Sequence, residues 1–214
     1  HSTFASLRNQ VAAGLNMGIA GIPWWTTDIG GFFGANINDP EFHELLVRWF
    51  EYGCFCPVMR LHGYRWPLQP QYGTTGGATC VSGAPNEVWS YTDQVCEILS
   101  DYLRLRERML PYITELMEEA HEKGTPVMRP LFYDFPEDKE SWNVETEYMF
   151  GPKVLVKPIT DADARETDVY LPGGASWTNA WTGETFEGGQ KVHVAAPIEQ
   201  IPLFTRDGYK LPMK

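Results

Sequence analysis

The segment from Gly21 to Gly63 decides the fold of this chain, opening with G-I-P-W-W-T-T-D-I-G-G-F (21–32) and closing with C-F-C-P-V-M-R-L-H-G (54–63). It contains parts of two short apolar runs: Gly18 to Trp25 overlaps its start, and Cys54 to Leu61 lies near its end. Runs of this length, separated by a helix, are typical of buried parallel strands in an α/β fold. We therefore expect a strand at each run.

Polar side chains follow both predicted strands. Asp28 comes after the first run, and Arg60 and His62 stand at the end of the second. In α/β barrels the ligand site is built at the carboxyl ends of the strands. The pattern predicts a ligand site here, in which Arg60 pairs either with Asp28 or with a carboxylate from another segment.

Helix signals surround the two runs. Ser2 or Thr3 can cap a helix that precedes the first run. Asp39 and Pro40 supply a cap and a first helical residue for the helix between the runs, which Gly53 should end. The apolar stripes of these helices contain Phe4, Leu7, Val11 and Leu15 in the first, and Phe42, Leu45, Leu46, Trp49 and Phe50 in the second.

A long excursion is expected over residues 63–90, which are rich in Gly, Pro, Thr and aromatic residues. Ser90 or Thr92 then caps a third helix. Pro111 lacks a backbone donor and should kink or restart this helix before it ends at Lys123 and Gly124.

The pattern changes after Thr125, where short β-rich runs are separated by Gly, Pro, Asp and Asn turns. This spacing predicts an antiparallel β-sandwich. We expect an α/β domain over residues 1–123 and a β-sandwich domain over residues 124–214.

Composition limits the partners and cofactors. The chain has 214 residues, a hydrophobic content of 43% and a net charge of -11, which indicate a folded protein and disfavour nucleic acid and anionic membranes as partners. Its four cysteines lack metal-ligand spacing with the histidines, and we expect Cys54 and Cys56 to be buried free thiols. We predict no metal and no organic cofactor, and both a cytoplasmic and a secreted location remain open.

The spellings W-W-T-T-D-I-G-G-F and M-R-L-H-G, about thirty residues apart, resemble the signatures of the α-glucosidases and α-xylosidases of glycoside hydrolase family 31. P-Y-I, G-T-P-V-M-R-P-L-F-Y-D-F-P, V-Y-L-P-G-G and W-T-G-E extend the resemblance through nearly the whole chain. A (β/α)₈ barrel needs eight strands and about 250 residues. The resemblance thus implies the last part of a TIM barrel followed by the β-sandwich domain.

In the family resembled, a retaining mechanism uses an Asp nucleophile and an Asp acid/base. The resemblance places both carboxylates upstream of His1, so no catalytic residue is expected within the 214 residues. The missing N-terminal part of the same enzyme then becomes an expected partner. Phe4, Trp24 and the Cys54 to Leu61 run should face that partner.

The resemblance also implies a sugar-binding role for residues near the two signatures. His62 would bond sugar hydroxyls, Phe32 would line the subsite, and Asp28 would orient polar groups of the subsite through Arg60. Trp25 is either a sugar contact or a core residue, and Asp28 is otherwise an ordinary loop-capping residue. The expected substrate is an α-linked oligosaccharide or α-glycoside.

Three functions agree with these observations. The leading one is the C-terminal segment of an α-glycosidase that hydrolyses terminal non-reducing α-linked glucose or xylose, inactive when isolated. The alternatives are a non-catalytic carbohydrate-binding or scaffold fragment and an α-transglycosylase of the same family. The sequence does not separate glucose from xylose preference.

Overall fold

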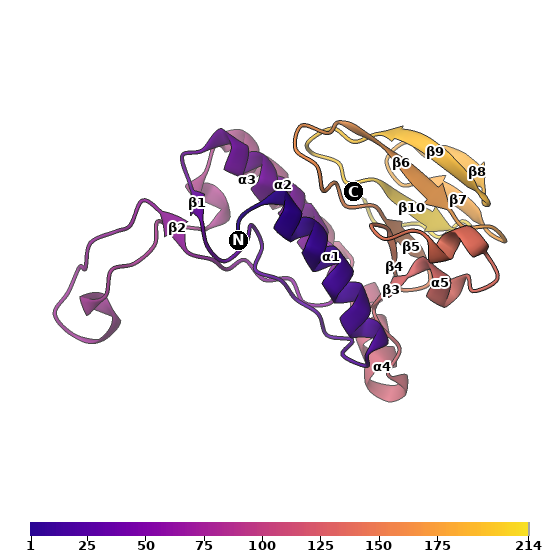
Figure 1. Ribbon diagram of the computed structural model, residues 1–214, viewed down its shortest axis with the longest axis horizontal. Coiled ribbons are helices and arrows are strands. Elements are labelled where there is room, and N and C mark those ends of the chain that lie inside the picture. The colour runs from indigo at the N-terminus through magenta and orange to yellow at the C-terminus, as the bar shows by residue number, and fades with distance from the viewer. Residues whose placement is uncertain (214) are drawn as a thin grey trace.

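A computed structural model describes residues 1–213 and shows a helical part packed against a β-sheet domain (Figure 1). The helices are α1 (Phe4–Ile19), α2 (Pro40–Cys54), α3 (Asp93–Arg108), α4 (Leu110–Lys123) and the short α5 (Leu131–Asp134). The helical part also holds β1 (Ala35–Asn36) and β2 (Arg65–Trp66), and from β2 the excursion extends away from the body of the molecule (Figure 1).

The predicted helix starts are confirmed by their caps. The side chain of Thr3 accepts from the amide of Ser6 at 3.1 Å, and that of Thr92 from the amide of Val95 at 3.3 Å. Asp39 caps α2 directly before Pro40, and α2 continues one residue beyond Gly53. Each cap satisfies an amide that has no partner within its own helix.

The break expected near Pro111 lies between α3 and α4, where Met109 is the last cap of one helix and the first cap of the next. Proline at the second position of α4 needs no amide partner, so the new helix begins there. Gly124 ends α4 in the left-handed conformation with φ 71°.

The two predicted strands are a partial error. Gly18 belongs to α1 and Cys54 to α2, and the chain between Ile22 and Thr27 and between Val58 and Gly63 forms no hydrogen-bonded strand. The two stretches nevertheless run side by side in the same direction, with hydrogen bonds from Val58 N to Trp25 O, Ile29 N to Arg60 O and Tyr64 N to Phe32 O at 3.1, 3.3 and 2.6 Å. Parallel pairing appears just beyond, where β1 pairs with β2.

The reason for this difference is the spacing of the hydrogen bonds. A parallel ladder has evenly spaced bonds along both strands. Here the bonds involve Trp25, Ile29 and Phe32 on the first stretch, four and three residues apart. Bonds this far apart do not form the continuous ladder of a regular strand.

The C-terminal part is an antiparallel sandwich, as predicted. A six-stranded sheet has the order β3-β4-β5-β10-β7-β8, and β6 pairs with β9 in a second sheet. The strands are β3 (Met128–Pro130), β4 (Tyr148–Phe150), β5 (Val154–Val156), β6 (Glu166–Leu171), β7 (Ser176–Asn179), β8 (Thr185–Glu187), β9 (Gln190–Ala195) and β10 (Leu203–Arg206).

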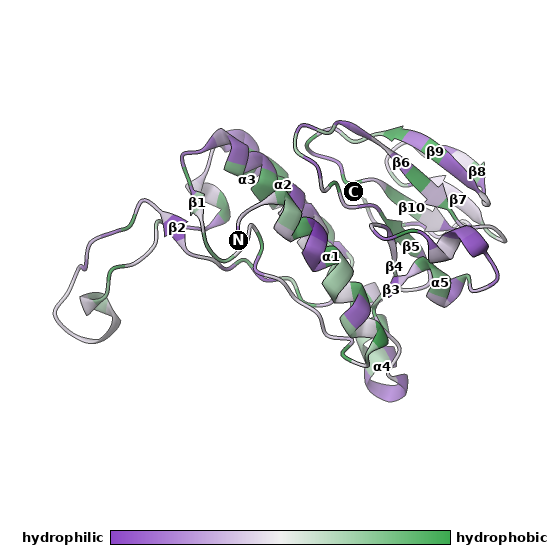
Figure 2. Ribbon diagram, in the orientation of Figure 1, coloured by the Kyte–Doolittle hydropathy of each residue, from purple (hydrophilic) through white to green (hydrophobic). Residues whose placement is uncertain are grey.

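The central strands β4 and β5 of the six-stranded sheet are buried on both faces, which explains their continuous apolar sequences. Because side chains alternate along a strand, Tyr148 and Phe150 join the core with the helices while Met149 between them joins the core between the sheets. Figure 2 shows hydrophobic segments in green on strands of the β-sheet domain and on α1 and α2. Tyr148 donates to Phe55 O at 2.9 Å, and Trp177 fills the sandwich core.

A buried polar cluster joins α2 to the β-sheet domain. Arg48 and Glu51 are fully buried and pair at 3.1 Å. Arg48 also donates to the carbonyls of Ala164, Ala196 and Pro197 at 2.9, 2.7 and 3.1 Å. These carbonyls belong to loops of the β-sheet domain, so one side chain links helix and sandwich.

Two buried carboxyls make the stability depend on pH. Burial raises the pKa of Glu51 from 4.5 to about 8 against the opposing charge of Arg48, and that of Glu147 to about 7 against Lys157. Both folded pKa values exceed the unfolded ones, so their contribution is fully present below about pH 4.5 and is lost as the pH rises through about 7 and 8. We expect the free energy of unfolding to fall by up to about 1.4 kcal/mol per pH unit for each group.

Urea unfolding at several pH values between about 5 and about 8 measures this slope. Glu51→Gln and Glu147→Gln should each flatten it. A slope that is unchanged in both variants would contradict the assignment.

Cys54 and Cys56 are buried free thiols, as predicted.

The apolar surface that was expected to face a partner is present only in part. Trp24 and Val58 are 55% and 41% exposed, but Phe4 is partly buried and Cys54 to Pro57 are buried. Of the helices in residues 1–213, none combines the length and apolar character needed to span a bilayer. The boundary at residues 123 and 124 remains a prediction.

Candidate functional site

A tight turn carries Asp28. The amide of Gly31 donates to the carbonyl of Asp28 at 2.8 Å, and Gly30 has a φ of 83°. A turn with a positive φ at its third residue favours glycine there. The D-I-G-G spelling is therefore a requirement of the backbone.

Gly30→Ala should lower the free energy of unfolding by about 1–3 kcal/mol, because a non-glycine residue at this φ is strained. A Cβ at Gly30 would also lie 2.9 Å from Nη2 of Arg65. The matched control is Gly34→Ala, whose φ is 102° but whose Cβ would meet no atom within 4 Å. Chemical unfolding should show a larger loss for Gly30→Ala, and an equal loss would contradict the role of the Arg65 contact.

Asp28 and Arg60 form an ion pair across the two side-by-side stretches. Asp28 is 24% exposed and Arg60 52% exposed, so both side chains keep contact with solvent. Of the two partners that the sequence allowed for Arg60, the structure supplies Asp28. The carboxylate and the guanidinium present acceptors and donors at one place, which suits a neutral polyhydroxylated ligand.

His62 and Phe32 lie together beside this pair. Their ring centroids are 5.6 Å apart with an angle of 40° between the planes, and Phe32 is 53% exposed. The structure thus gathers Asp28, Phe32, Arg60 and His62 at one end of the paired stretches. These residues are the Asp28 cluster.

Trp25 takes a different direction. Its indole packs on α1 at Gly14, where an added Cβ would lie 2.7 Å from the indole nitrogen, and it joins the core of the helical part. The indole nitrogen is buried and has no hydrogen-bond partner among the described residues. This placement favours packing over sugar contact for Trp25.

Arg65 falls within the long excursion expected over residues 63–90 but does not lie on the surface. The residue is fully buried and donates to Gly31 O at 2.7 Å and to Ile29 O at 3.0 Å. Its neighbour Tyr64 stacks on Phe33 with centroids 6.0 Å apart. The glycines at 30 and 31 were the sequence signal for this contact. Glycine lets the backbone approach another group closely, and the side chain of Arg65 is the group that lies against Gly30.

A polar face of α1 completes the surroundings of Asp28. Ser6, Asn9 and Gln10 line a cavity of about 240 Å³ together with His1, Thr27, Asp28, Gly31, Phe32 and Trp49. Sequence reasoning followed the apolar stripe of α1 and missed this face. The spacing of three and four residues between Ser6, Asn9 and Gln10 could have shown it.

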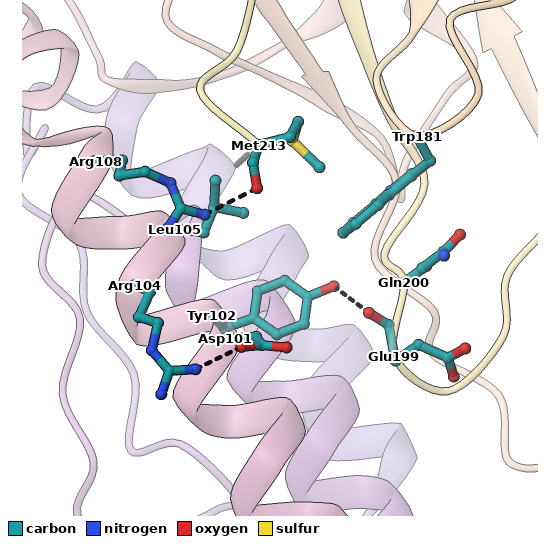
Figure 3. A pocket seen from close by; sticks show the side chains of 9 residues that line it. All are labelled: Asp101, Tyr102, Arg104, Leu105, Arg108, Trp181, Glu199, Gln200 and Met213. Carbon is teal, nitrogen blue, oxygen red and sulfur yellow. Dashed lines mark hydrogen bonds and ion pairs between the residues drawn. The ribbon is translucent and has the colours of Figure 1, made fainter.

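A second cavity, of about 270 Å³, lies between α3 and the β-sheet domain (Figure 3). Several of its polar groups bond within the chain: Tyr102 donates to Glu199 O at 3.1 Å, Arg108 donates to Met213 O at 2.9 Å, and Arg104 pairs with Asp101 at 2.7 Å. We place the candidate site at the Asp28 cluster, because that cluster lies at the ends of the two segments that the sequence singled out. Residues 1–213 contain no grouping of three His, Cys, Asp or Glu side chains suited to a metal ion.

Comparison with protein families matches both parts of the chain. Residues 1–116 match the glycosyl hydrolases family 31 TIM-barrel domain, and residues 124–211 match the glycosyl hydrolase family 31 C-terminal domain. The helices and parallel pairing therefore belong to a TIM-barrel domain, and the antiparallel sheets form the domain that follows it.

Curated relatives agree. The chain is 40% identical over 210 residues to an alpha-xylosidase of Saccharolobus solfataricus, covering 98% of this chain and 26% of that protein. It is 35% identical to alpha-glucosidase 2 of Bacillus thermoamyloliquefaciens, covering 91% of this chain and 22% of that protein. The chain spans about a quarter of the length of such relatives.

Solved structures show that the similarity includes the three-dimensional fold. A family 31 alpha-xylosidase from a soil metagenome, complexed with xylose, is 52% identical with a TM-score of 0.94, over 99% of this chain and 32% of that one. A xylosidase from Aspergillus niger is 37% identical with a TM-score of 0.86, over 97% of this chain and 30% of that one. With both domain types matched in order along nearly its whole length, this chain belongs to glycosyl hydrolase family 31.

Proposed function

We propose that this chain forms part of a retaining α-glycosidase that releases terminal non-reducing α-linked xylose or glucose, and that it supplies part of the sugar-binding subsite. The observation that carries the proposal is the Asp28 cluster, in which an ion pair and an aromatic pair lie at the ends of the two signature segments. Polar groups that fix orientation beside an aromatic face are typical of a site for a polar, ring-shaped ligand.

Each member of the Asp28 cluster has a role that fits a pyranose. Phe32 offers its exposed ring to the C–H face of the sugar, while the imidazole of His62 bonds a hydroxyl. Asp28 accepts from a second hydroxyl, and Arg60 orients its carboxylate through the ion pair. Trp25 supports the site from behind by packing on α1.

The chemistry needs two further carboxyls. A retaining mechanism uses a nucleophile and an acid/base about 5–5.5 Å apart. Asp28 already pairs with Arg60, so we assign it to binding. By the family resemblance, both catalytic Asp residues precede the residue numbered His1, and the sugar held by the Asp28 cluster is presented to them. Contacts that strengthen as the ring flattens toward the oxocarbenium-like transition state lower the barrier.

An α-xyloside is the first substrate to test, because the xylose complex reported above is that of a 52% identical relative. The experiment measures hydrolysis of an aryl α-xyloside and an aryl α-glucoside, with the intact mass recorded on the same sample. Turnover that requires a longer polypeptide or a second chain would support the proposal. Turnover by a single 24.3 kDa species would contradict the assignment of the catalytic carboxylates.

Two other outcomes separate the alternatives. A longer polypeptide that binds the sugar without turnover would indicate a non-catalytic carbohydrate-binding protein. Transfer of the sugar to an added saccharide acceptor, at the expense of release into water, would indicate a transglycosylase.

A further inference from the structure

We propose that Arg65 is a positioning residue that holds the Asp28 turn in place and ties it to Ala84 and Asn86, where the excursion over residues 63–90 returns to the body of the molecule. This inference rests on the proposed function, because it concerns the geometry of the same subsite. Arg65 itself is fully buried and does not face a sugar.

The contacts to the turn come from both ends of one guanidinium. Nη1 donates to Gly31 O at 2.7 Å and Nη2 donates to Ile29 O at 3.0 Å. These carbonyls lie on either side of Gly30, and Ile29 directly follows Asp28. Because the guanidinium is planar and its donors are fixed relative to one another, the two bonds fix the orientation of the turn.

The same residue closes the base of the excursion. The carbonyl of Arg65 accepts from the amide of Ala84 at 2.9 Å, and Nε donates to Oδ1 of Asn86 at 3.2 Å. Oδ1 of Asn86 also accepts from the hydroxyl of Tyr91 at 2.5 Å. Arg65, near the start of the excursion, is therefore bonded to Ala84 and Asn86, near its end.

The surroundings of Arg65 leave its side chain little freedom. Its guanidinium carbon lies 5.0 Å from the centroid of the Phe42 ring, on α2. An added Cβ at Gly63 would lie 2.5 Å from Nη1, so the chain between His62 and Arg65 passes directly against the guanidinium. One buried cation thus touches both segments that carry the Asp28 cluster.

This arrangement couples the excursion to the Asp28 turn. A change in the excursion that shifts Asn86 or Ala84 moves the guanidinium, and the guanidinium moves the turn that bears Asp28. Misplacement of a binding group by about 1 Å can cost about a hundredfold in rate. The excursion thereby acts on the subsite without contacting the sugar.

The test uses Arg65→Lys in the active enzyme that contains this chain, because lysine keeps the charge but cannot make the planar pair of bonds. We expect kcat/KM for the aryl α-xyloside to fall about 10- to 100-fold. Asn86→Ala, which removes only the acceptor of Nε, should cause a smaller fall and serves if Arg65→Lys does not fold.

A double-mutant cycle with Asp28→Ala, which removes the side chain that the turn positions, separates positioning from general stability. If Arg65 acts through the Asp28 turn, Arg65→Lys should change kcat/KM by less than about threefold in the Asp28→Ala background, since coupled residues are not additive. The matched control is Arg106→Lys, because Arg106 also donates to three carbonyls, those of Cys54, Cys56 and Pro57, at 2.8, 2.6 and 2.8 Å. Its effect should be the same in both backgrounds.

Hydrogen exchange of the amides of Ile29, Gly31 and Tyr64 gives a readout that needs no activity. Exchange should speed up in Arg65→Lys and stay unchanged in Arg106→Lys. Additive effects in the cycle, wild-type kcat/KM in Arg65→Lys, or unchanged exchange would each overturn the inference. An inactive wild type with faster exchange in Arg65→Lys would instead overturn the proposed function and leave the mechanical role of Arg65 supported.

Discussion

Replacement of Arg48 by methionine is expected to lower the free energy of unfolding by about 3–5 kcal/mol, because several buried acceptors lose their donor at once and each one left unpaired costs about 1–3 kcal/mol. Arg48 and Glu51 are fully buried, so the carboxyl of Glu51 would lose its charged donor away from water. The carbonyls of Ala164, Ala196 and Pro197 would lose theirs as well. Urea unfolding at fixed pH measures the change.

Two further variants sharpen this result. Arg48→Lys keeps the charge but cannot reach all four acceptors, so its loss should be smaller. Glu51→Gln keeps an oxygen that accepts from Arg48. The same side chain can accept from the hydroxyl of Tyr102, which donates to Glu51 at 3.1 Å. Of the three variants, Glu51→Gln should therefore lower the free energy of unfolding least near neutral pH. A methionine variant as stable as the wild type would show that this cluster does not hold the domains together.

Replacement of Asp28 by alanine is expected to lower kcat/KM of the enzyme that contains this chain by about a hundredfold, equivalent to about 2.7 kcal/mol of transition-state binding. The variant removes the proposed acceptor of a sugar hydroxyl and leaves Arg60 without its carboxylate partner. Asp28→Asn retains an oxygen acceptor and should lose less, about tenfold. Initial rates on the aryl α-xyloside measure both.

Asp161→Asn is the matched control for Asp28. Asp161 also pairs with an arginine, Arg8 at 2.5 Å, but this pair is exposed and joins α1 to a loop of the β-sheet domain. Exposed ion pairs contribute about 0–1 kcal/mol, and this one lies outside the Asp28 cluster. A loss in Asp28→Ala no larger than in Asp161→Asn would remove Asp28 from the subsite.

The position of α2 connects the β-sheet domain to the Asp28 cluster. Its residues are buried from Leu45 to Cys54, because the helix packs between the segments of the Asp28 cluster and the sandwich. On one side Trp49 donates to Thr27 at 3.2 Å, next to Asp28. On the other side Arg48 bonds the β-sheet domain. The sandwich thereby supports the helix that supports the site.

Much of the fold followed from local sequence signals. The caps at Thr3, Asp39 and Thr92, the restart near Pro111 and the end at Gly124 depend on residues within one turn of one another. The antiparallel sandwich followed from short runs with turn residues between them. Asp28, Phe32, Arg60 and His62 were named from the two signature segments, and their sugar contacts stay a prediction.

The sequence by itself determined the helix ends, the order of the two domains and the D-I-G-G turn, because each depends on the backbone preferences of neighbouring residues. The tertiary structure alone decided that the two apolar runs pair sparsely, that Trp25 packs on α1 and that Arg65 is buried under the turn. These features depend on which distant segments lie beside one another. A guanidinium in a polar loop has the same sequence signal whether it faces water or the carbonyls of a turn more than thirty residues away, and only packing chooses between them.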